Sequence, residues 1–428
     1  MLLRVLTVLL FPGLLLAAAP PEKREPNYDE SKVPAYTLPD PLVATDGTPV
    51  RDADAWRNGR RAEILRLYES HVHGRSPGRP EAMRFEVLEV DAHALQGKAV
   101  REQVRIHFSG AKDGPKADIL IYMPAEAKKP SPVFLALSFS PNHRVHADPG
   151  IRLSESWDRR EKKKRPEDEG TRGASAKPWP IEAILARGYG VAILYYCDIE
   201  PDFEGGMKDG VRPLFFEAGQ TQPGPDEWGA IGAWAWGLSR AADYLETDKR
   251  VDPRRIIALG QSRLGKTVLW AGAQDERFAM VVASCSGEMG AALSRRDYGE
   301  TVDDMIRAFP YQFAPNFREF AGKWSALPVD AHLLISLIAP RPLFLNTGSE
   351  DQWSDPKGEF LAAVAADPVY RLLGKKGLGT DVMPKLDEPV MSGSIGFVCH
   401  TGKHEILPAD WDRFLDFADA HLHSTGGR

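Results

Sequence analysis

The segment IIALGQSRLGKTVLWAGA, residues 256–273, decides the fold of this chain. An apolar strand pattern runs into Gly260, and Ser262 lies at the turn before a helical pattern begins. This is the G-x-S-x-G nucleophile elbow with one extra residue before the second glycine, Gly265. Such a turn exposes the serine hydroxyl above a sheet and directs the N–H of Arg263 to where an oxyanion would form. Ser262 is therefore the candidate nucleophile, and the alternative is an ordinary glycine-rich turn between a strand and a helix.

Strand and helix patterns alternate along the rest of the chain. Short apolar or alternating runs predict strands, and longer amphipathic runs predict helices. The predicted strands are residues 84–90, 99–109, 117–124, 132–140, 191–198, 255–262, 280–287, 341–349 and the start of 393–405. The predicted helices are residues 52–68, 180–190, 226–247, 265–274 and 409–422. This alternation indicates the α/β-hydrolase fold, a three-layer sandwich with a mixed, mostly parallel central sheet.

The N-terminus predicts export. Arg4 precedes a short apolar run that ends in small residues, so residues 1–19 are expected to be a signal peptide. The run is shorter than the roughly 20 residues of a spanning helix, which disfavours the alternative of a membrane anchor. Residues 20–48 are expected to form an extended lead-in, and residues 49–428 a single catalytic domain. The mature protein is expected to be secreted or periplasmic, without stable membrane association.

The composition is that of a soluble globular protein. Hydrophobic residues make up 43% of the 428 residues, and 54 basic against 60 acidic residues give a formal charge of −6. A mildly acidic chain lacks the basic surface of a nucleic-acid binder. The sequence has no His/Cys cluster with metal-ligand spacing, so no metal is expected. The segment GQSRLGKT, residues 260–267, has the letters of the phosphate-binding motif G-x-x-x-x-G-K-[ST], but its place at the elbow favours the serine nucleophile, so no organic cofactor is expected. The charged segment 155–179 is expected to be a solvated surface loop.

A serine nucleophile needs a base and an acid, which follow it in this fold in the order acid, then histidine. His404, after the last predicted strand, is the candidate base, and His400 is its rival on that strand. Asp351 lies in the loop where this fold commonly places its acid. Glu350 and Glu288 are the alternative acids, because a carboxylate need only orient the imidazole and stabilise its charged form.

Several segments in a fixed order carry a family resemblance. They are RGYGVAILYYCDIEPDF (187–203), GQSRLGKTVLWAGA (260–273), CSGEMGAALSRRDYGET (285–301), NTGSEDQWSDPKG (346–358), GKHE (402–405) and DWDRFLDF (410–417). With these segments the chain resembles carbohydrate esterase family 15, the glucuronoyl esterases, over most of its mature length. That family hydrolyses esters of glucuronic acid, including 4-O-methyl-glucuronate in cross-links between glucuronoxylan and lignin.

The resemblance implies roles for four residues around the elbow. Arg263 follows the serine and is expected to serve the oxyanion and the uronate ester oxygen. Lys266 and Glu300 match residues that bind sugar hydroxyls. Trp353 matches a sugar-binding tryptophan, an apolar plate with one N–H donor. The alternatives are core packing for Trp353 and an exposed surface charge for Glu300.

Two positions depart from the family pattern. Many members carry their catalytic glutamate where this chain has Cys285, and a neutral cysteine cannot replace a carboxylate. The resemblance then points to the bacterial-type arrangement with Asp351 as acid, and Glu288, three residues past Cys285, is the fallback. Fungal relatives have a cysteine before the serine where this chain has Gln261. Cys285 and Cys399 both lie at loop-side strand ends, and a disulfide between them stays open in an exported protein.

The expected activity is that of a secreted serine esterase working through an acyl-enzyme. Its expected partner is a glucuronate ester or a carbohydrate derived from glucuronoxylan. One alternative is an acetyl or acetylxylan esterase on the same fold, but an acetyl group needs no arginine such as Arg263 beside the serine. The other is an inactive carbohydrate-binding relative, which would not need to keep Ser262 and His404.

Overall fold

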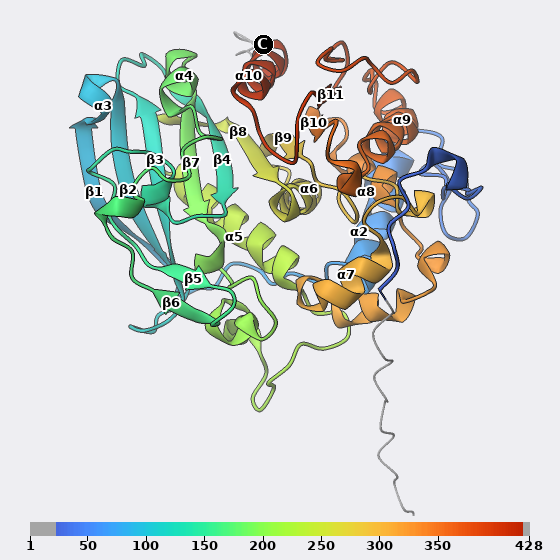
Figure 1. Cartoon of the computed structure of the whole chain (residues 1–428), viewed down its shortest axis with the longest axis horizontal. Coiled ribbons are helices and arrows are strands. Elements are labelled where there is room, and N and C mark those ends of the chain that lie inside the picture. The colour runs from blue at the N-terminus through green and yellow to red at the C-terminus, as the bar shows by residue number, and fades with distance from the viewer. Residues whose placement is uncertain (1–22, 423–428) are drawn as a thin grey trace, which may run out of the picture.

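The computed structural model describes residues 23–422, so the expected signal peptide lies outside the described residues. Within them, one large sheet has the strand order β1-β2-β3-β7-β4-β8-β9-β10-β11 (Figure 1). Its strands are β1 (Arg84–His93), β2 (Ala99–His107), β3 (Lys116–Pro124), β4 (Ser131–Ser138), β7 (Gly190–Tyr195), β8 (Val251–Gln261), β9 (Phe278–Ser284), β10 (Leu343–Gly348) and β11 (Ile395–His400). Pairing is antiparallel from β1 to β7 and parallel from β7 to β11, which confirms the predicted mixed, mostly parallel sheet.

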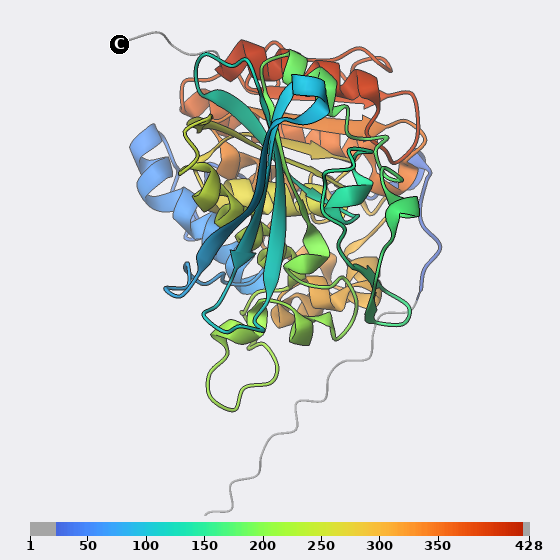
Figure 2. The same cartoon turned by 90° about the vertical axis from the view of Figure 1, so that its left-hand side faces the viewer.

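Helices cover both faces of this sheet and complete the predicted three layers (Figures 1 and 2). One face carries α2 (Arg61–His71), α5 (Ala230–Leu245), α6 (Arg263–Gln274), α8 (Ala331–Ile338) and α9 (Pro356–Leu372), and the other carries α4 (Ile181–Ala186) and α10 (Pro408–Leu422). Along β4, Val133 and Leu135 belong to one hydrophobic core, and Phe134 and Ala136 belong to the other. The run from Val133 to Leu137 of β4 is therefore apolar at every position, because both faces of this strand are buried.

Several helices differ from the sequence prediction. The predicted helix over 52–68 is a short α1 (Ala53–Ala55), a π-helical turn at Trp56–Arg60 and then α2. Neither α8 nor α9 was predicted. The sequence of α8 is almost wholly apolar and the helix is buried all round, so it has no amphipathic period. Helix α9 contains Pro368, a residue that normally ends a helical pattern.

The charged segment 155–179 is more firmly held than a solvated loop would be. It contains a small hairpin of β5 (Ser156–Asp158) and β6 (Lys163–Arg165). The Trp157 ring packs against Phe203 with centroids 5.6 Å apart, and Nη2 of Arg159 lies 3.1 Å from Oδ2 of Asp202. The outer side of the segment is exposed as predicted, while these inner side chains attach it to the protein.

The turn between β8 and α6 requires its two glycines. A Cβ on Gly260 would lie 2.1 Å from the carbonyl oxygen of Leu264, and one on Gly265 would lie 3.0 Å from the Cβ of Ser286. Between them, Ser262 has φ 58° and ψ −130°, a strained conformation for a residue other than glycine. The elbow predicted from residues 256–273 is thus present, and it lies at the carboxyl edge of the parallel strands.

Candidate active site

A cavity of about 460 Å³ opens at the elbow. It brings together the predicted Ser262, Arg263, Lys266, Glu300, Asp351, Trp353 and His404. Further lining comes from Cys285, Met305, Ala308, Phe309, Gln312 and Ser354. Residues from distant parts of the sequence therefore meet at one edge of the sheet, which is where open α/β sheets place their ligands.

The backbone holds Ser262 at the N-terminus of α6. Its N–H donates to the carbonyl of Ser284 at 2.8 Å, and its own carbonyl accepts from the N–H of Lys266 at 3.1 Å. Arg263 is the first residue of α6, so its N–H is one of the donors that lack a partner within a helix. This N–H and the positive end of the helix dipole can stabilise negative charge beside the serine.

His404 is oriented by Asp351. Nδ1 of His404 lies 2.6 Å from Oδ2 of Asp351, and Nε2 of Gln261 donates to the His404 carbonyl at 2.9 Å. Burial raises the pKa of the Asp351 carboxyl, but the hydrogen bond and charge of His404, helped by Ser354, bring that pKa below its usual value. The carboxylate is therefore ionised at neutral pH, and engaging Nδ1 leaves Nε2 as the nitrogen that can accept a proton.

The alternative base and acids lie elsewhere. His400 is buried on β11, with Nδ1 3.1 Å from Oδ2 of Asp410, and Glu350 is exposed. Glu288 is buried and accepts a 2.5 Å hydrogen bond from the Ser294 hydroxyl. Burial raises the pKa of the Glu288 carboxyl well above its usual value, which disfavours the carboxylate that a catalytic acid needs. The structure thus places Asp351, and neither glutamate, against the candidate base.

The Arg263 guanidinium is held by a buried carboxylate. Its Nη1 donates to Oδ2 of Asp202 at 2.5 Å, and the guanidinium carbon lies 5.0 Å from the centre of the Phe309 ring. The carboxylate of Asp202 also accepts hydrogen bonds from Tyr196, Tyr311 and Gln312. Burial raises the pKa of Asp202, but the charges of Arg263 and Arg159 and these hydrogen bonds lower it overall. Sequence reasoning did not identify Asp202.

Lys266, Glu300 and Trp353, for which the resemblance implies sugar contacts, form one wall of the cavity, called here the sugar wall. Nζ of Lys266 lies 3.6 Å from Oε2 of Glu300, and both side chains are largely buried. The N–H of Glu300 donates to the carbonyl of Trp353 at 2.8 Å. Trp353 itself is 37% exposed at the cavity. The side chain of Trp353 is therefore not core packing, and Glu300 is not an exposed surface charge.

The sequence did not predict the residues that form a second wall of the cavity. Met305, Ala308 and Phe309 come from or follow α7 (Val302–Ala308), which was not predicted. The signal was present, because Thr301 and Asp304 form a capping box at the start of this helix. Reading that motif would have placed a short helix directly after Glu300.

Cys285 lies in the cavity as a free thiol. Cys197 and Cys399 are also free, so Cys285 and Cys399 form no disulfide. Sγ of Cys285 and one ligand atom each of Asp351 and His404 lie within 4.8 Å of one another. This donor set would suit a soft divalent cation. However, burial raises the pKa of the Cys285 thiol well above its usual value, which opposes the thiolate that such an ion requires.

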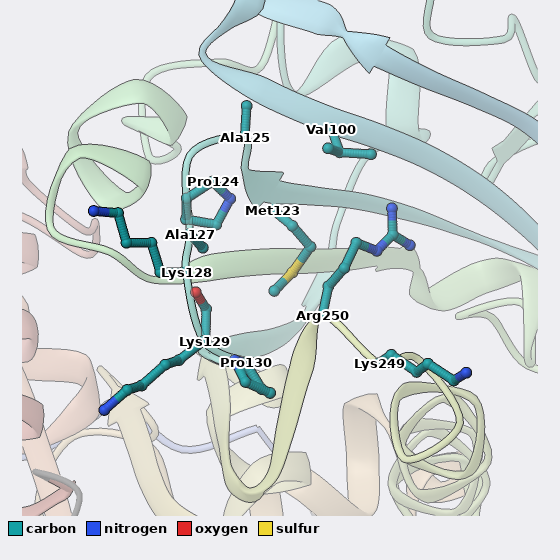
Figure 3. A pocket seen from close by; sticks show the side chains of 11 residues that line it. Val100, Met123, Pro124, Ala125, Ala127, Lys128, Lys129, Pro130, Lys249 and Arg250 are labelled. Atoms are coloured by element: carbon teal, nitrogen blue, oxygen red, sulfur yellow. The ribbon is translucent and has the colours of Figure 1, made fainter.

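A smaller hollow of about 240 Å³ lies at the opposite edge of the sheet, where β4 begins (Figure 3). Lys128, Lys129 and Lys249 extend outward from it, away from Met123 (Figure 3). None of the residues that line it was a predicted site residue. Across residues 23–422, no helix combines the length and apolar character needed to cross a membrane.

Comparisons with known proteins identify the family of this chain. A family model described as glucuronyl esterase of fungi matches residues 221–374. The carbohydrate esterase MZ0003 of an unknown prokaryotic organism is 46% identical over 430 residues, covering 99% of this chain and 98% of that protein. The solved glucuronoyl esterase from Solibacter usitatus has a TM-score of 0.89 at 52% identity, covering 91% of this chain and 99% of that one. A promiscuous CE15 esterase from the marine bacterial metagenome has a TM-score of 0.86 at 45% identity, covering 93% and 100%. The chain therefore belongs to carbohydrate esterase family 15, the glucuronoyl esterases, and is a carboxylic ester hydrolase.

Proposed function

We propose that this enzyme hydrolyses esters of glucuronic acid, including the 4-O-methyl-glucuronate of glucuronoxylan in its cross-links to lignin alcohols. One observation carries the proposal. The cavity that contains Ser262, His404 and Asp351 also contains Arg263 and the pair of Lys266 with Glu300. A uronate ester presents an ester carbonyl and sugar hydroxyls within one ring, so it can use both groups of residues at once.

The reaction proceeds through an acyl-enzyme. Ser262 attacks the ester carbonyl carbon while Nε2 of His404 takes the hydroxyl proton. The oxyanion is stabilised by the Arg263 N–H and guanidinium. The carbon–oxygen bond to the alcohol then breaks, and His404 returns its proton to the departing alcohol. A water molecule, deprotonated by His404, attacks the acyl-enzyme carbonyl. The bond to Ser262 then breaks, His404 returns the proton to the Ser262 oxygen, and free glucuronate leaves. Throughout, Asp351 orients the imidazole and stabilises its charged form.

The sugar wall of Lys266, Glu300 and Trp353 selects the acid part of the ester. Lys266 donates to sugar hydroxyls and Glu300 accepts from them, while the exposed Trp353 ring offers an apolar plate to the sugar face. An acetyl group has no hydroxyls for this wall. The enzyme is therefore expected to prefer uronate esters over acetyl esters, because an acetyl ester cannot make these polar contacts.

Initial rates on a benzyl ester of glucuronic acid and on a small acetyl ester test the proposal. The glucuronate ester is expected to be hydrolysed much faster. Arg263→Ala is expected to lower kcat/KM on the glucuronate ester by about 10- to 100-fold, the worth of a charged hydrogen bond. Arg254→Ala is the control, since it removes an exposed arginine from the far end of β8. A faster acetyl ester would make the enzyme an acetyl esterase, and binding without turnover would make it an inactive relative.

We also propose that residues 1–19 direct export and that residues 49–428 fold as the catalytic domain. The short apolar run after Arg4 supports the first proposal. Expression with export machinery, followed by N-terminal sequencing of the secreted protein, tests it. Cleavage near Ala19 is the expected result, and retention of Met1 on a cytoplasmic product would contradict it.

A further inference from the structure

The N-terminal segment that precedes α1 lies against the loop that leads into Glu300 of the cavity. The carbonyl of Asn27 accepts from the N–H of Gly299 at 2.9 Å, and Nη1 of Arg24 donates to Asp297 at 2.9 Å. Glu30 accepts from Arg296 at 2.5 Å and from Lys357 at 2.7 Å. Figure 1 shows this segment, in dark blue, running past the C-terminal half of the chain near α7. The lead-in is therefore attached to the same loop that supplies Glu300.

The segment presents an aromatic ring beside the cavity. Tyr28 is 50% exposed, and its ring meets Tyr298 edge to face, with centroids 6.1 Å apart. The Tyr298 hydroxyl lies 2.6 Å from Oε1 of Gln352, the residue before Trp353. Burial and, after it, the charge of Asp351 raise the pKa of the Tyr28 hydroxyl. Tyr28 is thus an exposed ring that packs on Tyr298, and Tyr298 is hydrogen-bonded to the residue before Trp353 of the cavity.

A hollow of about 680 Å³ lies at this ring. Among the described residues that line it, the polar ones are Arg24, Glu25, Asn27, Asp29, Lys32 and Asp297. Asp297 and Glu300 of the catalytic cavity are three positions apart in the chain, a length that spans at most about 10 Å. Neighbouring sugar rings of one oligosaccharide can bridge that distance.

We propose that Tyr28 and this hollow form a subsite for a neutral pyranose of the xylan chain that carries the glucuronate ester. The inference rests on the proposed function. An aromatic plate surrounded by hydrogen-bonding groups matches a sugar ring, which has apolar faces and a rim of hydroxyls. An aryl alcohol would need apolar enclosure, and among the described residues that line the hollow only Pro26 and Tyr28 have apolar side chains. The apolar lining of the cavity comes instead from α7.

Three substrates separate the possibilities: the methyl ester of glucuronic acid, its benzyl ester, and a xylo-oligosaccharide bearing glucuronate methyl ester. Tyr28→Ala is expected to raise KM for the oligosaccharide about fivefold, with kcat unchanged, because a stacking contact is lost. The two simple esters are expected to keep their wild-type constants. Tyr28→Phe retains the ring and is expected to behave as the wild type on all three.

Val90→Ala is the matched control, because Val90 is 53% exposed on β1 at the far edge of the sheet. Binding of the same oligosaccharide to Ser262→Ala and to the double variant with Tyr28→Ala gives a readout without turnover. The dissociation constant of the double variant should be higher by the same factor as the KM. Unchanged constants on all substrates, or an equal loss on all three, would overturn the subsite. A loss confined to the benzyl ester would show that the ring contacts the alcohol instead. A wild-type enzyme that hydrolyses none of the three would refute the proposed function itself.

Discussion

The Nη1 atom of Arg263 lies 2.5 Å from Oδ2 of Asp202, a carboxylate that is wholly inside the protein. Tyr311 and Gln312 donate to the other oxygen, Oδ1, at 2.7 and 2.9 Å. With its carboxylate fully engaged, Asp202 has a fixed position, and it fixes the guanidinium in turn. A positively charged group next to a nucleophile is effective only when its orientation is set before the substrate arrives.

Replacing Asp202 with asparagine tests this relationship. Asp202→Asn keeps the shape but removes the negative charge, so kcat/KM on a glucuronate ester is expected to fall by about 10-fold or more. The melting temperature is also expected to fall, because Arg263 and Arg159 lose a buried partner. Tyr311→Phe is the control: it removes one neutral donor and should cost about 1 kcal/mol of stability with little effect on rate. An Asp202→Asn enzyme with wild-type kinetics would contradict the positioning role.

The acid that serves His404 can be identified by two isosteric variants. Asp351→Asn is expected to lower kcat by up to about 10⁴-fold, because an amide cannot stabilise the imidazolium or hold its tautomer. Glu288→Gln is expected to leave kcat close to wild type, since the Glu288 side chain accepts from the Ser294 hydroxyl and has no hydrogen bond to His404. Steady-state rates on the benzyl ester measure both. The reverse ranking would assign the acid to Glu288.

Glu359 of α9 makes stability depend on pH. It is fully buried and accepts from the Gly287 N–H at 2.6 Å and the Ser286 hydroxyl at 3.1 Å. Burial raises its pKa from 4.5 to about 8, against the lowering effect of these bonds. As pH rises, the unfolded chain therefore releases this proton first, so the contribution of Glu359 to the free energy of unfolding falls between pH 4.5 and 8 and is level above that.

Glu359→Gln removes this titration while keeping an uncharged side chain of the same shape. The wild type is expected to lose stability relative to the variant by no more than about 1.4 kcal/mol per pH unit across that window. Urea unfolding at several pH values between 5 and 8 measures the difference. Glu126→Gln, at an exposed position in the loop after β3, should run parallel to the wild type. Parallel curves for Glu359→Gln would show that the carboxyl is ionised in the folded protein.

The elbow glycine predicts a steric effect. Gly260→Ala places a methyl group 2.1 Å from the Leu264 carbonyl oxygen, so the turn must move. The variant is expected to lose about 1–3 kcal/mol of stability and to lose activity as Ser262 shifts. Gly59→Ala, where a Cβ meets nothing within 4 Å, is expected to be neutral or slightly stabilising. Thermal melts and benzyl ester rates of the pair decide the point, and equal behaviour would contradict it.

The sequence by itself determined the sheet and the elbow. Every predicted strand corresponds to an observed one, because apolar periodicity is a local property that each segment carries. The predicted order of Ser262, Asp351 and His404 also placed these residues at one edge, since parallel strands end on the same side. Helices α8 and α9 escaped prediction because burial on every side and an internal proline remove the usual local signals.

Only the tertiary structure decided which side chains meet. Arg263 and Asp202 are 61 positions apart, and Asp351 and His404 are 53 apart, so no local pattern pairs them. The choice between Asp351 and Glu288 depended on which loop reaches the imidazole. The segment that contains Tyr28 is held beside the Glu300 loop by ion pairs between residues more than 260 positions apart in the sequence. Such contacts depend on how the packed layers bring distant segments together. Periodicity along one segment carries no information about its distant neighbours.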